Sequence, residues 1–113
     1  MNFHRGDIAL VLFPDSNLRT SKRRPALVVQ ADGMGLGLRQ TIVAMITSNL
    51  DRAGYASRVL VRASSVRQSG LLMDSVIMTD NLATVHDAEI DRVLGVLPDM
   101  TAVEASLRRT LAL

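Results

Sequence analysis

The sequence of 113 residues contains no cysteine and no tryptophan, and its aromatic residues are Phe3, Phe13 and Tyr55. Without cysteine the chain can form neither disulfides nor thiolate metal sites, and it has no thiolate nucleophile. Three aromatic side chains cannot build the broad stacking platform of a sequence-tolerant single-strand binder. The fold must therefore be held by packing, and any nucleic acid would be read by hydrogen bonds and arginine stacking.

The sequence also lacks long apolar runs. None approaches the roughly 18 to 20 residues that cross a bilayer, and residues 1–7 contain no apolar segment of the signal-peptide kind. We therefore expect a cytoplasmic protein without a membrane span. The length suits one hydrophobic core, and no linker rich in proline, glycine and serine interrupts it. These features predict a single domain over residues 1–113.

Residues that commonly carry hydrolytic chemistry are sparse. There is no GxSxG motif, and the densest acidic group, Asp87, Glu89 and Asp91, is typical of a solvated turn before a strand. We therefore expect no metal site and no cofactor. His4 and His86 could divide the roles of general acid and base, although both are equally consistent with surface positions. The sequence leaves that alternative open.

Short β-branched and leucine-rich runs separated by polar or glycine-rich stretches predict strands. Pro25 has no N–H to give to a ladder and is expected at the first residue of its strand, after a basic loop. Residues 33–37 are expected to be a flexible hairpin connection. The predicted strands cover residues 7–13, 25–31, 40–46, 58–62, 75–78, 82–85 and 92–97. This spacing predicts a mainly β fold, a small antiparallel barrel.

One helix is expected near the C-terminus. Thr101 and Glu104 stand in capping-box register, and Met100 precedes the expected cap as a staple residue. An apolar stripe then follows at spacing i, i+4, i+8, made of Val103, Leu107 and Leu111. The helix is expected to cover the barrel.

Four basic residues fall within six positions, although the net charge is only +2. Such a cluster creates a local positive potential and favours a polyanionic partner, but a solvated basic loop would have the same composition. Charge does not separate the two readings. The cluster comprises Arg19, Lys22, Arg23 and Arg24.

The order of three segments resembles the MazF/PemK toxins of type II toxin–antitoxin systems. These segments are Gly6-Asp7-Ile8, then residues 22–29 with the sequence KRRPALVV, then Ile46-Thr47-Ser48. The resemblance continues over nearly the whole chain, through Gly70-Leu71, Ser75-Val76, Asp80-Asn81, Thr84-Val85, Gly95 and the final helix. The combination is far more specific than any one of these motifs.

The resemblance implies a small SH3-like, PemK-type barrel with short helices and a C-terminal α-helix, assembled as a homodimer. It implies metal-independent, sequence-selective cleavage of single-stranded RNA to 2′,3′-cyclic phosphate and 5′-hydroxyl ends, which arrests translation and growth. It also implies a cognate MazE-like antitoxin. Arg24 and Thr47 match the catalytic positions, and the RNA-binding positions are Arg19, Lys22, Arg23, Ser48, Asp80 and Asn81.

RNA carries its own nucleophile, the 2′-hydroxyl, so the protein must supply proton transfer and stabilise the phosphorane charge. A guanidinium stays protonated at ordinary pH, which suits Arg24 to binding the phosphate and donating to the leaving oxygen. Thr47 would hydrogen-bond the scissile phosphate, and the general base stays open. The structural alternatives are an ordinary loop charge for Arg24 and a strand-ending side-chain turn for Thr47.

Two other functions compete with RNA cleavage. One is a CcdB-like toxin that binds DNA gyrase and catalyses nothing. The other is a degenerate relative that only binds RNA or an antitoxin, for which Asn81 is the warning sign because the family commonly has Gln there. Cleavage of naked RNA by the purified protein separates both from a ribonuclease.

Overall fold

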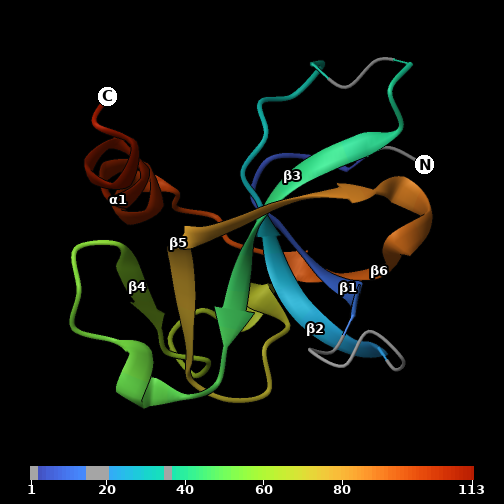
Figure 1. Ribbon diagram of the computed structural model, residues 1–113. Coiled ribbons are helices and arrows are strands. Elements are labelled where there is room, and N and C mark those ends of the chain that lie inside the picture. The colour runs from blue at the N-terminus through green and yellow to red at the C-terminus, as the bar shows by residue number, and fades with distance from the viewer. Residues whose placement is uncertain (1–2, 15–20, 35–36) are drawn as a thin grey trace.

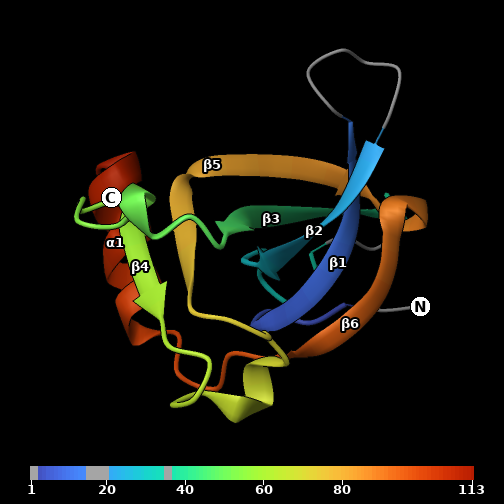
Figure 2. The same cartoon turned by 90° about the horizontal axis from the view of Figure 1, so that it is seen from below.

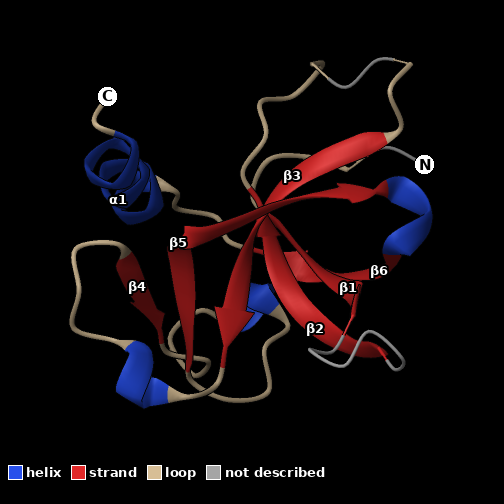
Figure 3. Ribbon diagram, in the orientation of Figure 1, coloured by secondary structure: helices blue, strands red, loops and turns tan. Residues whose placement is uncertain are grey.

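The computed structural model describes residues 3–14, 21–34 and 37–113. These residues form one antiparallel sheet in the order β4-β5-β3-β2-β1-β6, which curves round on itself (Figures 1 and 2). The strands are β1 (Asp7–Pro14), β2 (Ser21–Val28), β3 (Gln40–Thr47), β4 (Arg58–Val61), β5 (Ser75–His86) and β6 (Ile90–Val96). Helix α1 (Thr101–Leu111) follows β6, and the other helical segments are short 3-10 turns (Figure 3). The predicted mainly β class with a C-terminal helix is confirmed.

Both faces of the central strands are buried. Because side chains alternate along a strand, Leu27 packs into one apolar cluster and its neighbours Ala26 and Val28 pack into another. The first cluster lies under α1, which contributes Val103. This double burial explains the continuous apolar run of residues 26–29. No helix among the described residues is long and apolar enough to cross a membrane.

The expectation that Pro25 begins its strand is wrong. β2 begins at Ser21, and Pro25 lies inside it, opposite Leu10 of β1. Val29 donates its N–H to Ile42 of β3, so alternation directs the nitrogen of Pro25 toward β3 as well. Proline has no N–H to donate. The β2–β3 ladder accordingly ends at the neighbouring residue Ala26, which lies opposite Met45. Proline is therefore tolerated here because it marks where β2 leaves β3.

The two short strands expected at 75–78 and 82–85 are one strand, β5, with a bulge. Its partners on β3 jump from Met78 opposite Met45 to Leu82 opposite Ala44, so residues 79–81 have no partner on that strand. Figure 2 shows the sharp bend of β5 between α1 and β3. Polar residues at the bulge made the sequence look like two strands, because a bulge interrupts the alternation of apolar positions.

The expected capping box at α1 is also wrong. The residue that precedes the helix is Met100, and Thr101 is the first helical residue. The carboxylate of Asp99 accepts the N–H of Thr101 at 3.0 Å and takes the place of the predicted cap. Glu104 instead lies 3.4 Å from the guanidinium of Arg5. The helix therefore begins one residue earlier than a Thr101 cap would allow.

Two glycines let β6 close against the segment that follows β4. A Cβ on Gly70 would lie 2.2 Å from the carbonyl oxygen of Leu94, and one on Gly95 would lie 2.1 Å from that of Gln68. No side chain fits at either position. On its other side β6 pairs with β1, where Asp7 lies opposite Val96. Backbone packing thus closes the curved sheet beside β6.

Candidate functional site

Arg24 and Thr47 lie on neighbouring strands, at the same end of the sheet and on the same face. Ala26 and Met45 are cross-strand partners, and Arg24 and Thr47 each lie two residues farther toward that end. Residues two apart on a strand share a face, so both side chains extend the face on which Ala26 and Met45 are buried. The structure therefore places the two residues that sequence analysis singled out on one face, at one end of the sheet.

β2 and β3 form no ladder hydrogen bonds with each other beside Arg24 and Thr47. The β2–β3 ladder stops at Ala26, whereas β3 stays paired with β5 as far as Thr47, which lies opposite Val76. Beyond Pro25, β2 pairs only with β1 and runs away from β3 in both ribbon views (Figures 1 and 2). We call residues 10–14 and 21–25 the β1–β2 arm; β6 still pairs with its base, at Leu10 and Val11, and beyond Val11 the arm has two strands. Because proline offers no N–H to β3, β2 diverges from β3 between Pro25 and Arg24, and Arg24 and Thr47 lie on diverging strands.

The hydroxyl of Thr47 is held by the turn that follows β3. Its Oγ1 accepts the N–H of Asn49 at 3.1 Å, and the side chain of Asn49 accepts the N–H of Asp51 at 3.1 Å. Thr47 does therefore end its strand through a side-chain turn. That hydrogen bond uses an oxygen lone pair, which leaves the hydroxyl hydrogen for a further acceptor such as a phosphate oxygen. Ser48, between Thr47 and Asn49 in the turn, is exposed.

The β1–β2 arm presents basic side chains to solvent. Lys22, Arg23 and Arg24 are all exposed, and Arg24 forms no ion pair with any residue in the described ranges. The guanidinium of Arg23 lies 3.7 Å from the carboxylate of Asp91, on the face opposite to that of Arg24. Arg19 lies outside the described residues. The predicted basic loop is thus in part an extended strand.

The bulge of β5 carries the other predicted site residues. Arg58 of β4 donates from Nε and Nη2 to the two carboxylate oxygens of Asp80, at 2.8 and 2.9 Å. These hydrogen bonds hold the pKa of Asp80 below its usual value, and they raise the pKa of Arg58. The guanidinium also donates to the carbonyl oxygen of Arg52 at 2.9 Å and lies over the ring of Tyr55. Asn81 is exposed.

Sequence analysis did not identify Arg58 as a site residue. Arg58 lies opposite Met78 of β5, and Met78 lies opposite Met45 of β3. Because Met45 and Thr47 are two residues apart on β3, Arg58 lies on the same face of the sheet as Thr47. Its partner Asp80 is 22 positions away, and no motif joins the two. Only the pairing of β4 with β5 brings them together.

The histidines lie away from this site. His86 pairs with Gln40, the first residue of β3, whereas Thr47 is the last. Its Nδ1 accepts the N–H of Ala88 at 3.3 Å. His4 precedes β1 and lies 3.7 Å from Asp32. Neither imidazole adjoins Arg24 or Thr47, which disfavours the scheme in which the two histidines share the proton transfers.

The acidic residues after β5 serve separate local contacts. Asp87 accepts the hydroxyl of Thr41 at 3.0 Å, and Glu89 accepts the N–H of His86 at 2.8 Å. Asp91 faces Arg23. Each of the three carboxylates therefore has a different partner, as expected for a turn that leads into a strand.

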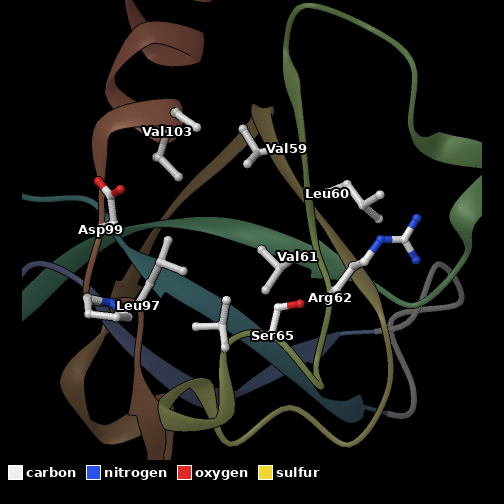
Figure 4. Close-up of a pocket in the computed structure, with 11 residues that line it drawn as sticks. Val59, Leu60, Val61, Arg62, Ser65, Leu97, Asp99 and Val103 are labelled. Atoms are coloured by element: carbon white, nitrogen blue, oxygen red, sulfur yellow. The ribbon is translucent and has the colours of Figure 1, made fainter.

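A cavity of about 420 Å³ lies between β4 and the start of α1 (Figure 4). Its walls are mainly apolar, with Val59, Val61, Leu97 and Val103 labelled around it. Val59 and Val61 alternate with Arg58 and Leu60 along β4 and so face away from the row that contains Thr47. Leu60 and Arg62 also line the cavity, but its lining includes neither Arg24 nor Thr47.

Comparison with known proteins gives consistent similarities. Residues 4–111 match the family described as PemK-like, MazF-like toxin of type II toxin-antitoxin system. The chain is 33% identical over 105 residues to Endoribonuclease MazF2 of Mycobacterium bovis and to Endoribonuclease MazF6 of Mycobacterium tuberculosis, with 90% of each chain covered.

Solved structures share the fold. Mycobacterium tuberculosis toxin MazF-mt6 is 25% identical, with a TM-score of 0.75 over 95% of this chain and 97% of that one. An endoribonuclease in complex with its cognate antitoxin from a mycobacterial species has a TM-score of 0.76 at 19% identity, over 99% of this chain and 97% of that one.

Proposed function

This chain belongs to the PemK-like, MazF-like toxin family of type II toxin–antitoxin systems, and we propose that Arg24 and Thr47 carry its endoribonuclease activity. The observation behind this assignment is that both side chains share one face at one end of the sheet, on either side of the opening that Pro25 creates. A phosphate placed at that opening would meet a guanidinium from β2 and a hydroxyl from β3.

In the proposed reaction the 2′-hydroxyl of the RNA loses its proton as it attacks the adjacent phosphorus, and the bond to the 5′-oxygen of the next nucleotide breaks as that oxygen gains a proton, so the reaction consumes and releases no proton overall. The products are a 2′,3′-cyclic phosphate and a 5′-hydroxyl. Arg24 would bind the phosphate oxygens, stabilise the added charge of the phosphorane and donate a hydrogen bond to the leaving oxygen. The hydroxyl of Thr47, oriented by Asn49, would donate to a second phosphate oxygen. The attacking hydroxyl supplies the nucleophile, so the scheme needs no metal ion.

Two groups of residues would bind the flanking nucleotides. On one side, Lys22 and Arg23 of the β1–β2 arm, together with Arg19, offer positive charge to the phosphates. On the other side, Ser48 and the bulge residues Asp80 and Asn81 offer hydrogen bonds to base edges. Because both oxygens of Asp80 bind Arg58, Asn81 is the freer of the two bulge side chains for base recognition.

The partner proposed for this toxin is an acidic segment of a cognate MazE-like antitoxin. A solved MazE–MazF complex of Deinococcus radiodurans has a TM-score of 0.74 to this chain at 19% identity, over 98% of this chain and 97% of that one. We further propose that the single domain works as a cytoplasmic homodimer, as the family resemblance implies.

Incubation of the purified protein with one long RNA tests this function, with both ends at each cut mapped. We expect cuts at a defined sequence, with cyclic phosphate and 5′-hydroxyl ends, and no cuts by Arg24→Ala. Absence of cleavage by a folded protein, or inhibition of DNA gyrase instead, would favour the non-enzymatic alternatives.

A further inference from the structure

Three hydroxyl side chains meet where β5 bends beneath α1. Thr79 Oγ1 lies 2.8 Å from Ser106 Oγ and 2.9 Å from Thr110 Oγ1. Thr79 also donates to the carbonyl oxygen of Ser57, and Ser106 donates to that of Ala56, each at 2.8 Å. Thr79 and Ser106 are both 0% exposed. This hydroxyl cluster therefore joins β5, α1 and the segment before β4.

Thr79 is the first residue of the bulge, and Asp80 and Asn81 follow it. The bulge has no hydrogen-bonded partner on β3, since the ladder resumes only at Leu82. On the β4 side the N–H of Thr79 donates to Ser57 at 2.9 Å. The main chain of the bulge is thus fixed at Thr79, by its N–H and by its hydroxyl, before the chain reaches Asn81.

We propose that Thr79, Ser106 and Thr110 are positioning residues through which α1 sets the place of Asp80 and Asn81 at the RNA site. The inference rests on the proposed function, in which the bulge contacts the bases beside the cut. Valine has nearly the shape of threonine but no hydroxyl, so Thr79→Val would remove the hydrogen bond from that hydroxyl to Ser57 and its contacts with Ser106 and Thr110, and only the N–H of Thr79 would still hold the start of the bulge. The bulge would then shift, because no β3 ladder holds it.

The test compares four single variants of the full chain on a short RNA that contains one cut site. Thr79→Val and Thr110→Val remove hydroxyls of the cluster, and Thr79→Ser keeps the hydroxyl. Thr41→Val is the matched control, because Thr41 is only 6% exposed and its hydroxyl binds Asp87 at the far end of β3. KM, kcat and the base preference at each cut are measured.

We expect Thr79→Val to raise KM about 10-fold, to change kcat less than about threefold and to broaden the base preference, because small displacements in a binding site carry large penalties. Thr110→Val should act in the same direction. Thr79→Ser should restore wild-type values to within about twofold, and Thr41→Val should leave them unchanged. Equal effects of Thr79→Val and Thr41→Val, or a wild-type base preference in folded Thr79→Val, would overturn the proposal.

A second measurement does not depend on catalysis. Hydrogen exchange of the amide of residue 79, which donates to Ser57 at 2.9 Å, should be faster in Thr79→Val and Thr110→Val than in wild type or Thr41→Val when it is measured in the RNA-free protein. Unchanged exchange would overturn the positioning role even if RNA cleavage were established. Faster exchange in a protein that cuts no RNA would keep the link between α1 and the bulge and reject the proposed function. If Thr79→Val fails to fold, Thr110→Val, which is only partly buried, decides the question.

Discussion

The carboxylate of Asp80, in the bulge of β5, and the guanidinium of Arg58, on the edge strand β4, form a bidentate ion pair with N–O distances of 2.8 and 2.9 Å. Parallel hydrogen bonds of this kind fix the relative orientation of the two groups as well as their separation. The pair therefore restrains the bulge from the side of β4, as the hydroxyl cluster does from α1.

The pH dependence of stability should report this pair. Because Arg58 lowers the pKa of Asp80 in the folded state, the unfolded chain binds that proton more tightly. The stabilisation is therefore fully present above the ordinary aspartate pKa of about 4 and is lost as the pH falls through the lower folded-state value. Denaturant unfolding of wild type and Asp80→Asn should show a stability difference at pH 7 that shrinks below pH 4. An identical difference at pH 7 and pH 3 would contradict the assignment, and Arg58→Gln should abolish the pH-dependent part.

Substitution of the two proposed catalytic side chains should separate them from the histidines. We expect Arg24→Ala and Thr47→Val each to lower kcat/KM by about 10²-fold or more, since each removes a donor to the transition-state phosphate. His4→Ala and His86→Ala should stay within about threefold of wild type. Rates are measured on a single-site RNA, with circular dichroism to verify folding. An inactive, folded His86→Ala beside an active Arg24→Ala would reverse the roles.

Chelation should leave cleavage intact. The RNA supplies its own nucleophile and the proposed scheme stabilises charge with Arg24 and Thr47, so a divalent ion has no required step. Cleavage rates measured after dialysis against EDTA should match the untreated rate. Loss of activity that magnesium or manganese restores would show that the scheme lacks a component.

Pro25→Ala tests whether the proline keeps the site open. The new N–H faces β3 and should donate to the carbonyl oxygen of Ile46, which extends the β2–β3 ladder toward Arg24. We expect a protected amide at position 25 in hydrogen exchange and a higher KM for RNA. The gained hydrogen bond and the lost rigidity of proline are each worth about 1 kcal/mol, so stability should change little. A solvent-exchanging amide at position 25 would refute the explanation.

The rate of association with an antitoxin should depend on the basic residues of the β1–β2 arm and on Arg19. Replacement of Arg19, Lys22 and Arg23 together by Gln should slow association and flatten its salt dependence, because long-range attraction acts mainly on the encounter rate. A control with the same charge change at Arg39, Arg67 and Arg108 should bind nearly as fast as wild type. Stopped-flow mixing with the acidic antitoxin segment measures both. We also expect the acidic segment to compete with RNA for the same site, and simultaneous binding of RNA and antitoxin there would contradict this.

The sequence predicted most of the strands because apolar alternation is a local signal. It misplaced Pro25 because a proline is tolerated inside a strand where the ladder on the side of its nitrogen has ended, and the end of that ladder depends on pairing across the sheet. It divided β5 because a bulge interrupts the alternation as a turn does. It misassigned the cap of α1 because Asp99 and Thr101 are both competent caps, and the geometry of the preceding loop decides between them.

The site was predictable only in part. Arg24 and Thr47 lie in short motifs whose order is recognisable, and their shared face follows from strand pairing. Arg58 and Thr79 have no such motif, because their partners are distant in sequence and become neighbours only when β4 and α1 pack on β5. Contacts of that kind depend on tertiary structure, which local patterns do not encode.

The pairing of β1 with β6 has a consequence for how the chain folds. Asp7 and Val96 are about 90 residues apart in the sequence, so their pairing closes the longest loop in the sheet and carries the largest entropy cost. The hairpins β1–β2 and β2–β3 need only short loops and can form earlier. We therefore expect the β1–β6 seam to close last in folding and to open first in partial unfolding, while the hairpins that carry Arg24 and Thr47 stay intact.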